Sequence, residues 1–434
     1  MSSSPANRII IVGGGLGGLA LAQSLKNANP PIPFHVFERD TSVAFRTQGY
    51  RIRISPDGAA ALQKLLPGHL WQAFEATSAP MQPGFSRMDA MTGQPTEWAT
   101  PLPGPPPKTG AGRQGFQEGK AYNVDRAILR SILLEGLEEH ISFGKKFQSY
   151  ITNSEGQVEV TFGDGSKEIG SLLVGADGTR SAIRRQLLPN FTVLDTEGRA
   201  VFGKTFRTPE LASAVPAEIV GGMSLTGESS ESPLKLFGDN MVFDKTLDSV
   251  MRTKYHIPSD YVYWVLCFRD DVVPTKSEEL LRFDHAQSAQ QAQSMASPWH
   301  SSIRTLIEKQ DVESASTLAF HTTSEELFTS AWSEFINSAE DTHPMATLLG
   351  DAAHPMSPVG GVGANSAFQD AADLFGALVE ISSGSRQTQD KIARLKEYER
   401  SMVERGVVMV KRSTGGAGHM FAMRPVAELK PVTH

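Results

Sequence analysis

Hydrophobic and polar positions at the start of the chain follow first a strand pattern and then a helix pattern. Residues 9–12 are an apolar, mostly β-branched run, and a glycine-rich turn follows them. After this turn, apolar residues recur at helical spacing, at Leu16, Leu19, Ala20 and Leu25. A second apolar run occupies residues 34–37. This order predicts a βαβ unit with two parallel strands.

A strand-like alternation dominates the middle of the chain, from about residue 199 to residue 269. In the segment YVYWVLCFR, one face of a strand would carry Val262, Trp264, Leu266 and Phe268. Ahead of this region, residues 123–139 have a helical pattern, and residues 157–178 predict strands joined by a Gly-Asp-Gly turn. The proline-rich residues 102–110 predict an exposed loop. The middle third therefore reads as a separate sheet domain.

The last part of the chain combines a short strand, an unusual loop and two helices. The run ATLL at 346–349 predicts a buried strand, and a loop rich in Gly and Pro follows it. Helices are predicted over 366–381 and 390–410, the second with an apolar stripe of Ile392, Leu395, Met402 and Met409. We expect the segment GGAGH near Gly415 to follow this last helix.

Composition and charge exclude several classes of partner. A chain of 434 residues can form two or three domains, and 40% apolar with 21% charged residues is typical of a soluble globular protein. The net charge of -7 argues against binding to nucleic acid or to an anionic membrane. No segment has the length of a membrane span or the apolar core of a signal peptide. The lone Cys267 lies in an apolar strand pattern, so we expect an inert thiol and a cytoplasmic location.

The first turn carries a dinucleotide-binding pattern. Gly13, Gly15 and Gly18 form Gly-x-Gly-x-x-Gly between the first predicted strand and helix. Such glycines let a pyrophosphate approach the N-terminus of the helix. Glu38 and Arg39 follow the second predicted strand, where an acidic side chain can bind a ribose hydroxyl. The pattern does not choose between FAD and NAD(P).

The late loop, GDAAHPMSPVGGVGAN, can make that choice. Asp351 at the strand end could accept hydrogen bonds from the ribityl hydroxyls of a flavin, and Gly360 to Gly363 would let backbone lie against its ring. The helix that begins near Asn365 would point its N-terminus at the ring edge, where negative charge develops on reduction. A surface loop between strand and helix is the alternative reading of the same residues.

Three motifs resemble the single-component, group A FAD-dependent monooxygenases, the aromatic hydroxylases. They are GGGLGG at Gly13, GADGTRSAIR at Gly175, and GDAAHPMSPVGGVGANSAFQDA at Gly350. The family includes para-hydroxybenzoate hydroxylase, salicylate hydroxylase and the tetracycline-inactivating flavin monooxygenase, and the chain is also similar to fungal secondary-metabolite members. The resemblance implies FAD as cofactor and NAD(P)H as co-substrate. It also implies specific cofactor-binding residues, namely Arg46, Arg126, Asp177, Asp351, Pro358, Gly361, Gly363 and Asn365.

The predicted fold class is α/β with an α+β substrate domain. A Rossmann-like FAD-binding domain would be assembled from residues 1–75, 110–195 and 335–384. A mixed or antiparallel-sheet substrate domain would comprise residues 76–109 and 196–334, and residues 385–434 would form a C-terminal helical segment. Because only one Gly-x-Gly-x-x-Gly follows a predicted strand, NAD(P)H is expected to bind transiently across the FAD domain and not in a second Rossmann domain.

The reaction that the resemblance implies uses the flavin and no catalytic side chain. NAD(P)H would reduce FAD, O2 would form a flavin C4a-hydroperoxide, and one oxygen atom would pass to an aromatic or polycyclic small molecule of secondary metabolism. Pro358 and Gly361 would lie near the ring. No metal-ligand spacing is present. Hydroxylation and epoxidation, monomer and dimer, and NADPH and NADH all stay open.

Two departures from the family concern the substrate. Arg53 occupies a position that is often acidic in relatives, and Phe202 stands where several relatives place a substrate-contacting arginine. An apolar or larger polycyclic substrate is therefore favoured, with Phe202, Phe237 and Tyr263 as candidate lining residues on an unassigned sheet face. His354 has no visible partner in the sequence, so we expect it to pack in its loop.

Other functions on this fold stay open at this point. A flavin oxidase or reductase would share the FAD site without inserting oxygen into a substrate. A flavin halogenase would also share the fold, but its Trp-x-Trp-x-Ile-Pro signature is missing. A non-catalytic carrier would keep the βαβ unit and could dispense with Asp351.

Overall fold

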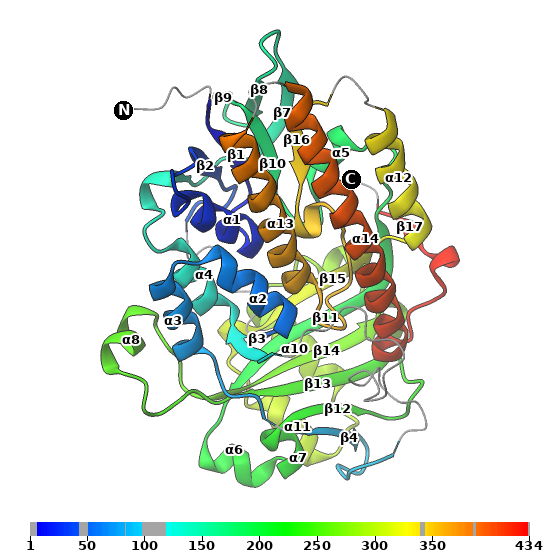
Figure 1. Ribbon diagram of the computed structural model, residues 1–434. Helices are drawn as coiled ribbons and strands as arrows, with labels where there is room; N and C mark the ends of the chain where they lie inside the picture. Colours follow the sequence, from blue (N-terminus) through cyan, green and yellow to red (C-terminus); the bar gives the residue numbers. More distant parts are fainter. Residues whose placement is uncertain are drawn as a thin grey trace, which may run out of the picture.

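Two sheets organise the molecule, a parallel one in its upper half and a larger mixed one in its lower half as drawn in Figure 1. The structure is a computed structural model that describes residues 7–42, 51–82, 84–97, 119–338, 343–384 and 388–432. Arg46 and the proline-rich loop at 102–110 lie outside the described residues. No helix within these ranges is long and apolar enough to cross a membrane.

The parallel sheet collects strands from distant parts of the chain. Its order is β16 (Ala346–Leu348), β10 (Leu172–Gly175), β1 (Ile9–Val12), β2 (Phe34–Phe37) and β6 (Ile141–Ser142). All neighbouring pairs are parallel, so the predicted βαβ unit is confirmed and extended on both sides. Because the strands run the same way, the segments that follow β1, β10 and β16 emerge at one edge.

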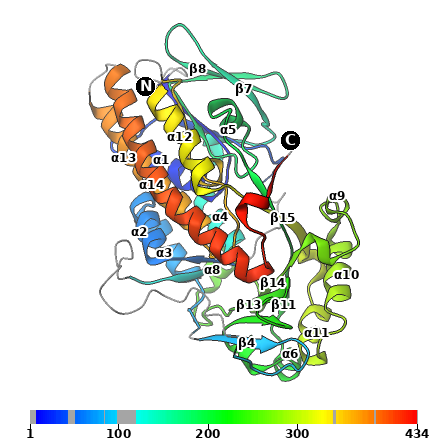
Figure 2. The ribbon, with the colours of Figure 1, turned by 90° about the vertical axis from the view of Figure 1, so that its right-hand side faces the viewer.

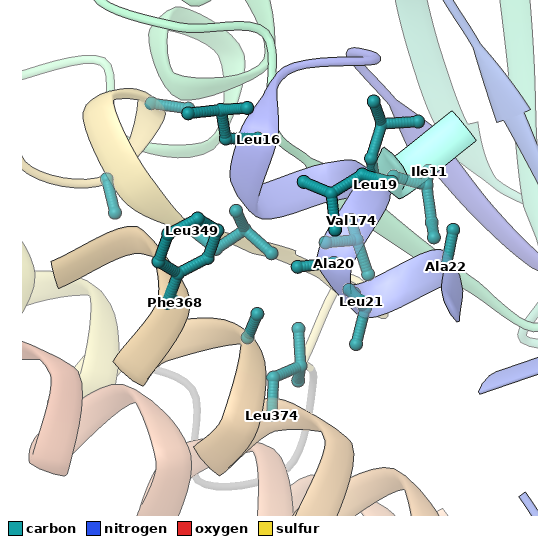
Figure 3. Packing of buried hydrophobic residues seen from close by; sticks show 14 of the residues in the cluster. Ile11, Leu16, Leu19, Ala20, Leu21, Ala22, Val174, Leu349, Phe368 and Leu374 are labelled. Carbon is teal, nitrogen blue, oxygen red and sulfur yellow. The ribbon is translucent and has the colours of Figure 1, made fainter. Parts of the chain in front are cut away.

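Two helices cover one face of this sheet. They are α1 (Leu16–Lys26) and α13 (Gly363–Ser383), and their apolar side chains meet those of β1 and β10 in one buried cluster (Figure 3). The α1 positions predicted to face the core, including Leu19 and Ala20, are fully buried. Leu349 and Phe368 extend the cluster toward the late glycine loop. This packing fixes the two loops that begin these helices relative to each other.

The larger sheet is antiparallel except at one edge. Its order is β15 (Ser316–Thr322), β11 (Leu194–Phe206), β14 (Tyr261–Arg269), β13 (Leu234–Met241), β12 (Met223–Gly227) and β4 (Phe85–Asp89). Only β12 and β4 pair in parallel, and β17 (Lys430–Pro431) adds a short antiparallel pairing to β11. The alternation over residues 199–269 therefore does form a sheet.

The two faces of this sheet belong to different cores. Val262, Trp264, Leu266 and Phe268 share one face, as predicted, and pack in a core that includes side chains of α10 (His285–Met295) and α11 (Ser301–Glu308). The opposite face carries Phe202 and Tyr263, which join the hydrophobic core of the parallel-sheet half. The second face is therefore the one turned toward the two glycine loops.

Five further strands form two small antiparallel sheets. They are β3 (Arg51–Ile54) with β5 (Tyr122–Asp125), and β7 (Phe147–Thr152) with β8 (Val158–Phe162) and β9 (Lys167–Gly170). The turn between β8 and β9 is the predicted Gly-Asp-Gly turn. The remaining α-helices are α2 (Pro56–Leu65), α3 (Gly68–Thr77), α4 (Arg126–Leu134), α5 (Ala182–Leu187), α6 (Pro209–Ala214), α7 (Ala217–Gly221), α8 (Ser249–Lys254), α9 (Ser277–Leu280) and α12 (Glu325–Ser338).

The helix predicted over 123–139 is shorter than its pattern suggests. Its first residues belong to β5, and α4 begins only at Arg126 because Asp125 caps it, accepting hydrogen bonds from the backbone N–H groups of Ala127 and Ile128. The helix ends at Leu134, two residues before Gly136, which has a positive φ of 72°. The capping aspartate therefore sets the first residue of α4.

The last helix is longer than predicted. α14 (Thr388–Phe421) runs from the flank of α13 down to the larger sheet (Figure 2) and includes the GGAGH segment, which we expected to follow it. Gly416 lies so close to Val359 that a Cβ there would be 2.9 Å from its Cγ1. The glycines thus allow the helix to pack on the late loop instead of ending the helix. At its far end, the ring centroid of Phe421 lies 5.7 Å from that of Phe320 of β15.

Candidate functional site

The glycine turn after β1 has three glycines with three different constraints. Gly13 has a φ of 116°, and a Cβ on it would lie 2.1 Å from the carbonyl oxygen of Ala176. A Cβ on Gly18 would lie 2.2 Å from the carbonyl oxygen of Gly13. At Gly15, by contrast, no atom of the described residues lies within 4 Å of a Cβ position. Gly13 and Gly18 are thus required by the fold, and Gly15 faces space that a ligand could use.

The N-terminus of α1 is open toward the same space. Gly15 is its N-cap, and no side chain of the described residues caps the first turn. Free N–H groups at a helix N-terminus attract phosphate. Glu38 is buried beside this turn, where its Oε2 accepts a hydrogen bond of 2.6 Å from the Gly14 N–H and its Oε1 one of 2.9 Å from the Asp40 N–H. Glu38 therefore shapes the turn itself, and Arg39 is exposed.

Asp351 follows β16 and lies half-buried next to the second motif. Its Oδ2 is 3.5 Å from the hydroxyl of Thr179. Burial raises the pKa of Asp351, and the positive charges of His354 and Arg126 offset part of that rise. Arg126, the first residue of α4, is thus close enough to the carboxyl to act on it electrostatically. A carboxylate with few protein partners is suited to accept hydrogen bonds from ligand hydroxyls.

Arg184 joins two of the cofactor motifs, and sequence reasoning missed it. Its Nη2 donates a hydrogen bond of 2.6 Å to the carbonyl of Thr179. Its Nη1 donates to the carbonyls of Ala352 and Asp351, at 2.8 and 3.2 Å. Burial lowers the pKa of Arg184 to about 10, so it stays charged at neutral pH. The signal in the sequence was its place as the last residue of the motif GADGTRSAIR, to which no role was given.

Asp177 organises the turn after β10. Its Oδ2 accepts hydrogen bonds from the backbone N–H groups of Ala182 and Ile183, at 2.7 and 3.4 Å, and so holds the start of α5. Its Oδ1 is buried and has no hydrogen-bond partner among the described residues. Gly178 follows with a φ of 80°. Asp177 is therefore a turn residue with one carboxylate oxygen left for a further partner.

The late glycine loop exposes its backbone. Pro358, Gly360 and Gly361 are exposed, and the two glycines have φ values of 91° and 63°. A Cβ on either glycine would have no neighbour within 4 Å in the described parts of the chain. At Gly363 a Cβ would lie 3.3 Å from Oδ1 of Asp351, which places the start of α13 beside the aspartate. A flat ring could thus lie against this backbone.

Asn365 fixes the loop through its side-chain amide. Its Oδ1 accepts a hydrogen bond of 2.8 Å from the Ser55 N–H. Its Nδ2 donates to the carbonyls of Arg53 and Gly361, at 3.0 and 2.8 Å. The amide therefore ties the glycine loop to the end of β3, and its main role in the described structure is to support the loop.

His354 is not the isolated histidine that the sequence suggested. Its Nε2 lies 2.6 Å from Oδ2 of Asp370, which also accepts a hydrogen bond from the Gly350 N–H at 2.8 Å. Nη2 of Arg405 in α14 donates to the other oxygen of Asp370 at 2.9 Å. The partner was invisible because it lies on the next helix, and the cluster holds Gly350 in place below the loop.

The predicted cofactor residues therefore converge in the described structure. The glycines of the first turn, Glu38, Asp177, Asp351 and the late glycines all lie at the carboxyl ends of β1, β2, β10 and β16. Arg126 approaches from α4. No group of three or more metal-ligating side chains is found in the described ranges.

The three candidate lining residues share one face of the larger sheet. The ring centroids of Phe202 and Tyr263 are 6.4 Å apart, and those of Phe237 and Tyr263 are 6.5 Å apart. They lie on β11, β14 and β13, on the face turned toward the parallel-sheet half. The three residues thus lie on the face turned toward the parallel-sheet half, and their contact with substrate stays a prediction.

Comparisons with known proteins agree with this geometry. The sequence model of a family described as "FAD binding domain" matches residues 120–413. The chain is 34% identical, over 97% of its length, to the dual O-methyltransferase/FAD-dependent monooxygenase elcB of Phaeosphaeria nodorum, of which it covers 47%. The chain spans about half the length of this relative and of two dual O-methyltransferase/FAD-dependent monooxygenases CTB3, from Cercospora beticola and Cercospora nicotianae, to which it is 32% identical.

Solved structures show the same architecture. A protein assigned as an FAD-containing monooxygenase from Photorhabdus luminescens is 25% identical with a TM-score of 0.73, covering 96% of this chain and 100% of that one. A salicylate hydroxylase in complex with its substrate has a TM-score of 0.64 at 18% identity, covering 98% of this chain and 92% of that one, and shares the fold. The α/β fold class and the resemblance to flavin-dependent aromatic hydroxylases are confirmed.

Proposed function

Because the chain belongs to the FAD binding domain family, we propose that it is an FAD-dependent monooxygenase acting on an aromatic or polycyclic small molecule. It would use NAD(P)H and O2 to hydroxylate or epoxidise this substrate in secondary metabolism. The observation that carries the proposal is the meeting of three loops, after β1, β10 and β16, at one edge of the parallel sheet. Arg184 ties the second and third of these loops together.

The residues present fit FAD. Gly15 and Gly361 leave space beside their backbone at two separate loops, as an extended dinucleotide requires. The carboxylate of Asp351 would accept hydrogen bonds from the ribityl hydroxyls. The buried Oδ1 of Asp177 could accept a further hydrogen bond. We propose that α1 binds the pyrophosphate and that Glu38 receives the adenosine ribose, while Arg126 and Arg46 approach the cofactor.

The helix that follows the late loop would control charge at the ring. α13 begins at Gly363 and has no side-chain cap from any described residue. Its N-terminal N–H groups would stabilise negative charge on the ring system. Asn365 keeps this helix start and Gly361 in a fixed relation through its amide. When bound, FAD supplies hydride acceptance from NAD(P)H and activation of O2.

The chain would then exclude water and orient the substrate. The face of the larger sheet with Phe202, Phe237 and Tyr263 offers aromatic surface for a flat molecule. We propose the substrate domain as residues 76–109 and 196–334, the FAD domain as 1–75, 110–195 and 335–384, and a C-terminal segment of 385–434. NAD(P)H would bind transiently, and we propose a cytoplasmic location.

An oxygen-insertion assay tests the function. The purified chain is loaded with FAD, its visible flavin absorbance is recorded, and NAD(P)H consumption is screened with hydroxylated aromatic compounds under heavy-isotope-labelled O2. We expect a product that carries one labelled oxygen atom. Consumption of NAD(P)H with hydrogen peroxide as the only oxygen product would favour an oxidase or reductase. A chain that binds no FAD would favour a non-catalytic carrier.

A further inference from the structure

A buried arginine lies between the small β3–β5 sheet and the larger sheet. Nη2 of Arg51 on β3 forms an ion pair with Asp239 on β13 and donates a hydrogen bond of 2.9 Å to Oδ1 of Asn123. Its guanidinium carbon is 6.0 Å from the ring centroid of Phe237. The side chain is only 9% exposed, and that of Asp239 is 1% exposed. None of these contacts was visible in the sequence.

One hydrogen-bond donor of the Arg51 guanidinium has no acceptor in the described parts of the chain. This donor is the buried Nε. Arg199 on β11 of the larger sheet provides a contrast, because its Nε donates to Ser277 and its other nitrogens to Asp195, Gly198 and Asp270. A buried donor without an acceptor costs about 1–3 kcal/mol. Arg405, which holds Asp370, also has a buried Nε without a partner among the described residues, so the unpaired donor of Arg51 indicates a ligand only together with the aromatic surface beside it.

Arg51 lies close in the chain to the late glycine loop. The carbonyl of Arg53 and the N–H of Ser55, in the same short segment, hold the side chain of Asn365. Asn365 in turn holds Gly361. The strand that carries Arg51 is therefore anchored to the backbone against which the flavin ring is proposed to lie.

The neighbouring aromatic face favours a substrate larger than one ring. Phe202, Tyr263 and Phe237 come from three adjacent strands, which span about 10 Å at the usual strand spacing. Phe237 stays half-buried although the sheet residues on both sides of it are buried. Arg51 stands at this end of the row, so one edge of a flat molecule would meet its guanidinium.

We propose that Arg51 is a specificity-determining residue that binds a phenolic hydroxyl or phenolate oxygen of a fused-ring aromatic substrate. Asp239 and Asn123 position the guanidinium by binding its Nη2, and Nε is left to face the ligand. Met223, whose sulfur is 3.9 Å from Nη2, and Phe237 supply apolar surface around the oxygen. This inference rests on the proposed function, since it names the chemistry of that site's substrate.

Two probes of nearly equal shape test the inference. Isothermal titration calorimetry of the FAD-loaded chain, without oxygen, compares 1,8-dihydroxynaphthalene with 1,8-dimethylnaphthalene, whose methyl groups match the hydroxyls in size and cannot accept a hydrogen bond. The two differ in their acidic hydroxyls and share the fused rings. Calorimetry needs neither turnover nor a flavin signal, so a failed oxygen-insertion assay and a failed binding result are separate outcomes.

The variants are Arg51→Lys and Asp239→Asn. Arg51→Lys keeps the charge beside Asp239 but loses the planar donor, so we expect affinity for the dihydroxy probe to fall about tenfold or more. Affinity for the dimethyl probe should not change. Asp239→Asn leaves the cation uncompensated, so it should strengthen binding of the dihydroxy probe above the pKa of its first hydroxyl. Arg199→Lys is the matched control and should leave both affinities unchanged.

Several results overturn the inference. Equal losses for both probes in Arg51→Lys, or no loss, would reduce Arg51 to a structural bridge. Weaker binding of the phenolate in Asp239→Asn would also reduce Arg51 to a structural bridge, because a purely structural ion pair predicts lower affinity in both variants. If Arg51→Lys does not fold, the affinity of Asp239→Asn decides alone. Failure of the unaltered, FAD-loaded chain to bind either probe would exclude the proposed substrate class.

Discussion

His354 and Asp370 form a fully buried hydrogen bond, with 2.6 Å between Nε2 and Oδ2. Burial alone would lower the pKa of His354, but the charge of Asp370 and the hydrogen bond raise it above its ordinary value. Burial would raise the pKa of Asp370, and His354 and Arg405 hold it below its ordinary value. Both pKa shifts therefore favour the charged form of the side chain, so His354 and Asp370 form an ion pair in the folded chain.

This ion pair predicts a pH-dependent stability. Because the pKa of His354 is raised, its contribution is complete below the ordinary value of 6.5 and is lost as pH rises through the raised pKa. The contribution of Asp370 is complete above 3.8 and is lost as pH falls through the lowered pKa. His354→Gln should cost about 3 kcal/mol between these limits and remove the decline above 6.5. Urea unfolding across pH measures both; an unchanged decline in the variant would contradict the assignment.

Arg184→Met should release FAD. The variant loses three hydrogen bonds from a charged donor that hold Thr179, Asp351 and Ala352 together, each with a net value of about 1.5–3 kcal/mol. Flavin fluorescence during dilution measures the release. Arg185→Met is the control, because Arg185 is exposed and its Nη1 donates to the carbonyl of Arg180 in the same segment. FAD retention equal to that of the control would show that the two loops do not need this bridge.

Gly15→Ala should weaken FAD binding, whereas Gly13→Ala should impair folding. At Gly15 the added methyl meets no described atom within 4 Å, so folding stability should stay within about 0.5 kcal/mol while FAD affinity falls. At Gly13 the methyl would lie 2.1 Å from a carbonyl oxygen at a φ of 116°, so the chain should fold poorly. Thermal melting and FAD titration separate the two. Normal FAD affinity in Gly15→Ala would place the pyrophosphate elsewhere.

Asp351→Asn should stabilise the FAD-free chain and weaken FAD binding. Burial raises the pKa of Asp351, so the folded chain loses stability as pH rises above 3.8 and through that raised value. A neutral amide removes this cost, by about 1 kcal/mol at neutral pH, and also removes a hydrogen-bond acceptor for the ribityl chain. Denaturation of the FAD-free form and titration with FAD give the two results. Full FAD occupancy in the variant would remove Asp351 from the site.

The parts of the site that sequence reasoning recovered depend on local patterns. Gly13, Gly15 and Gly18 stand at fixed spacing between a strand and a helix, and each spacing reflects a constraint within one turn of chain. The alternation of Val262, Trp264, Leu266 and Phe268 likewise needs only the geometry of one strand. Such patterns predicted the βαβ unit and the four residues that share one face of β14, whereas the direction in which that face points stayed unassigned.

The parts that sequence reasoning missed depend on contacts between distant segments. Arg184 meets Ala352, and Arg51 meets Asp239, across long stretches of chain that no periodic pattern links. The continuation of α14 through Gly416 was missed for the same reason, because the glycine is needed by Val359 on another segment. A burial pattern for one helix cannot indicate which side chain or loop lies opposite.

The path of α14 also affects how cooperatively the chain unfolds. Arg405 holds Asp370 near the middle of α14, Ser413 donates a hydrogen bond of 2.7 Å to the carbonyl of Ser357, and Phe421 packs against Phe320 of the larger sheet. One continuous helix therefore packs against both the parallel-sheet half and the larger-sheet half. Heating should melt both in a single cooperative transition, and amide hydrogens of β1 and β14 should exchange with solvent at the same free energy of opening.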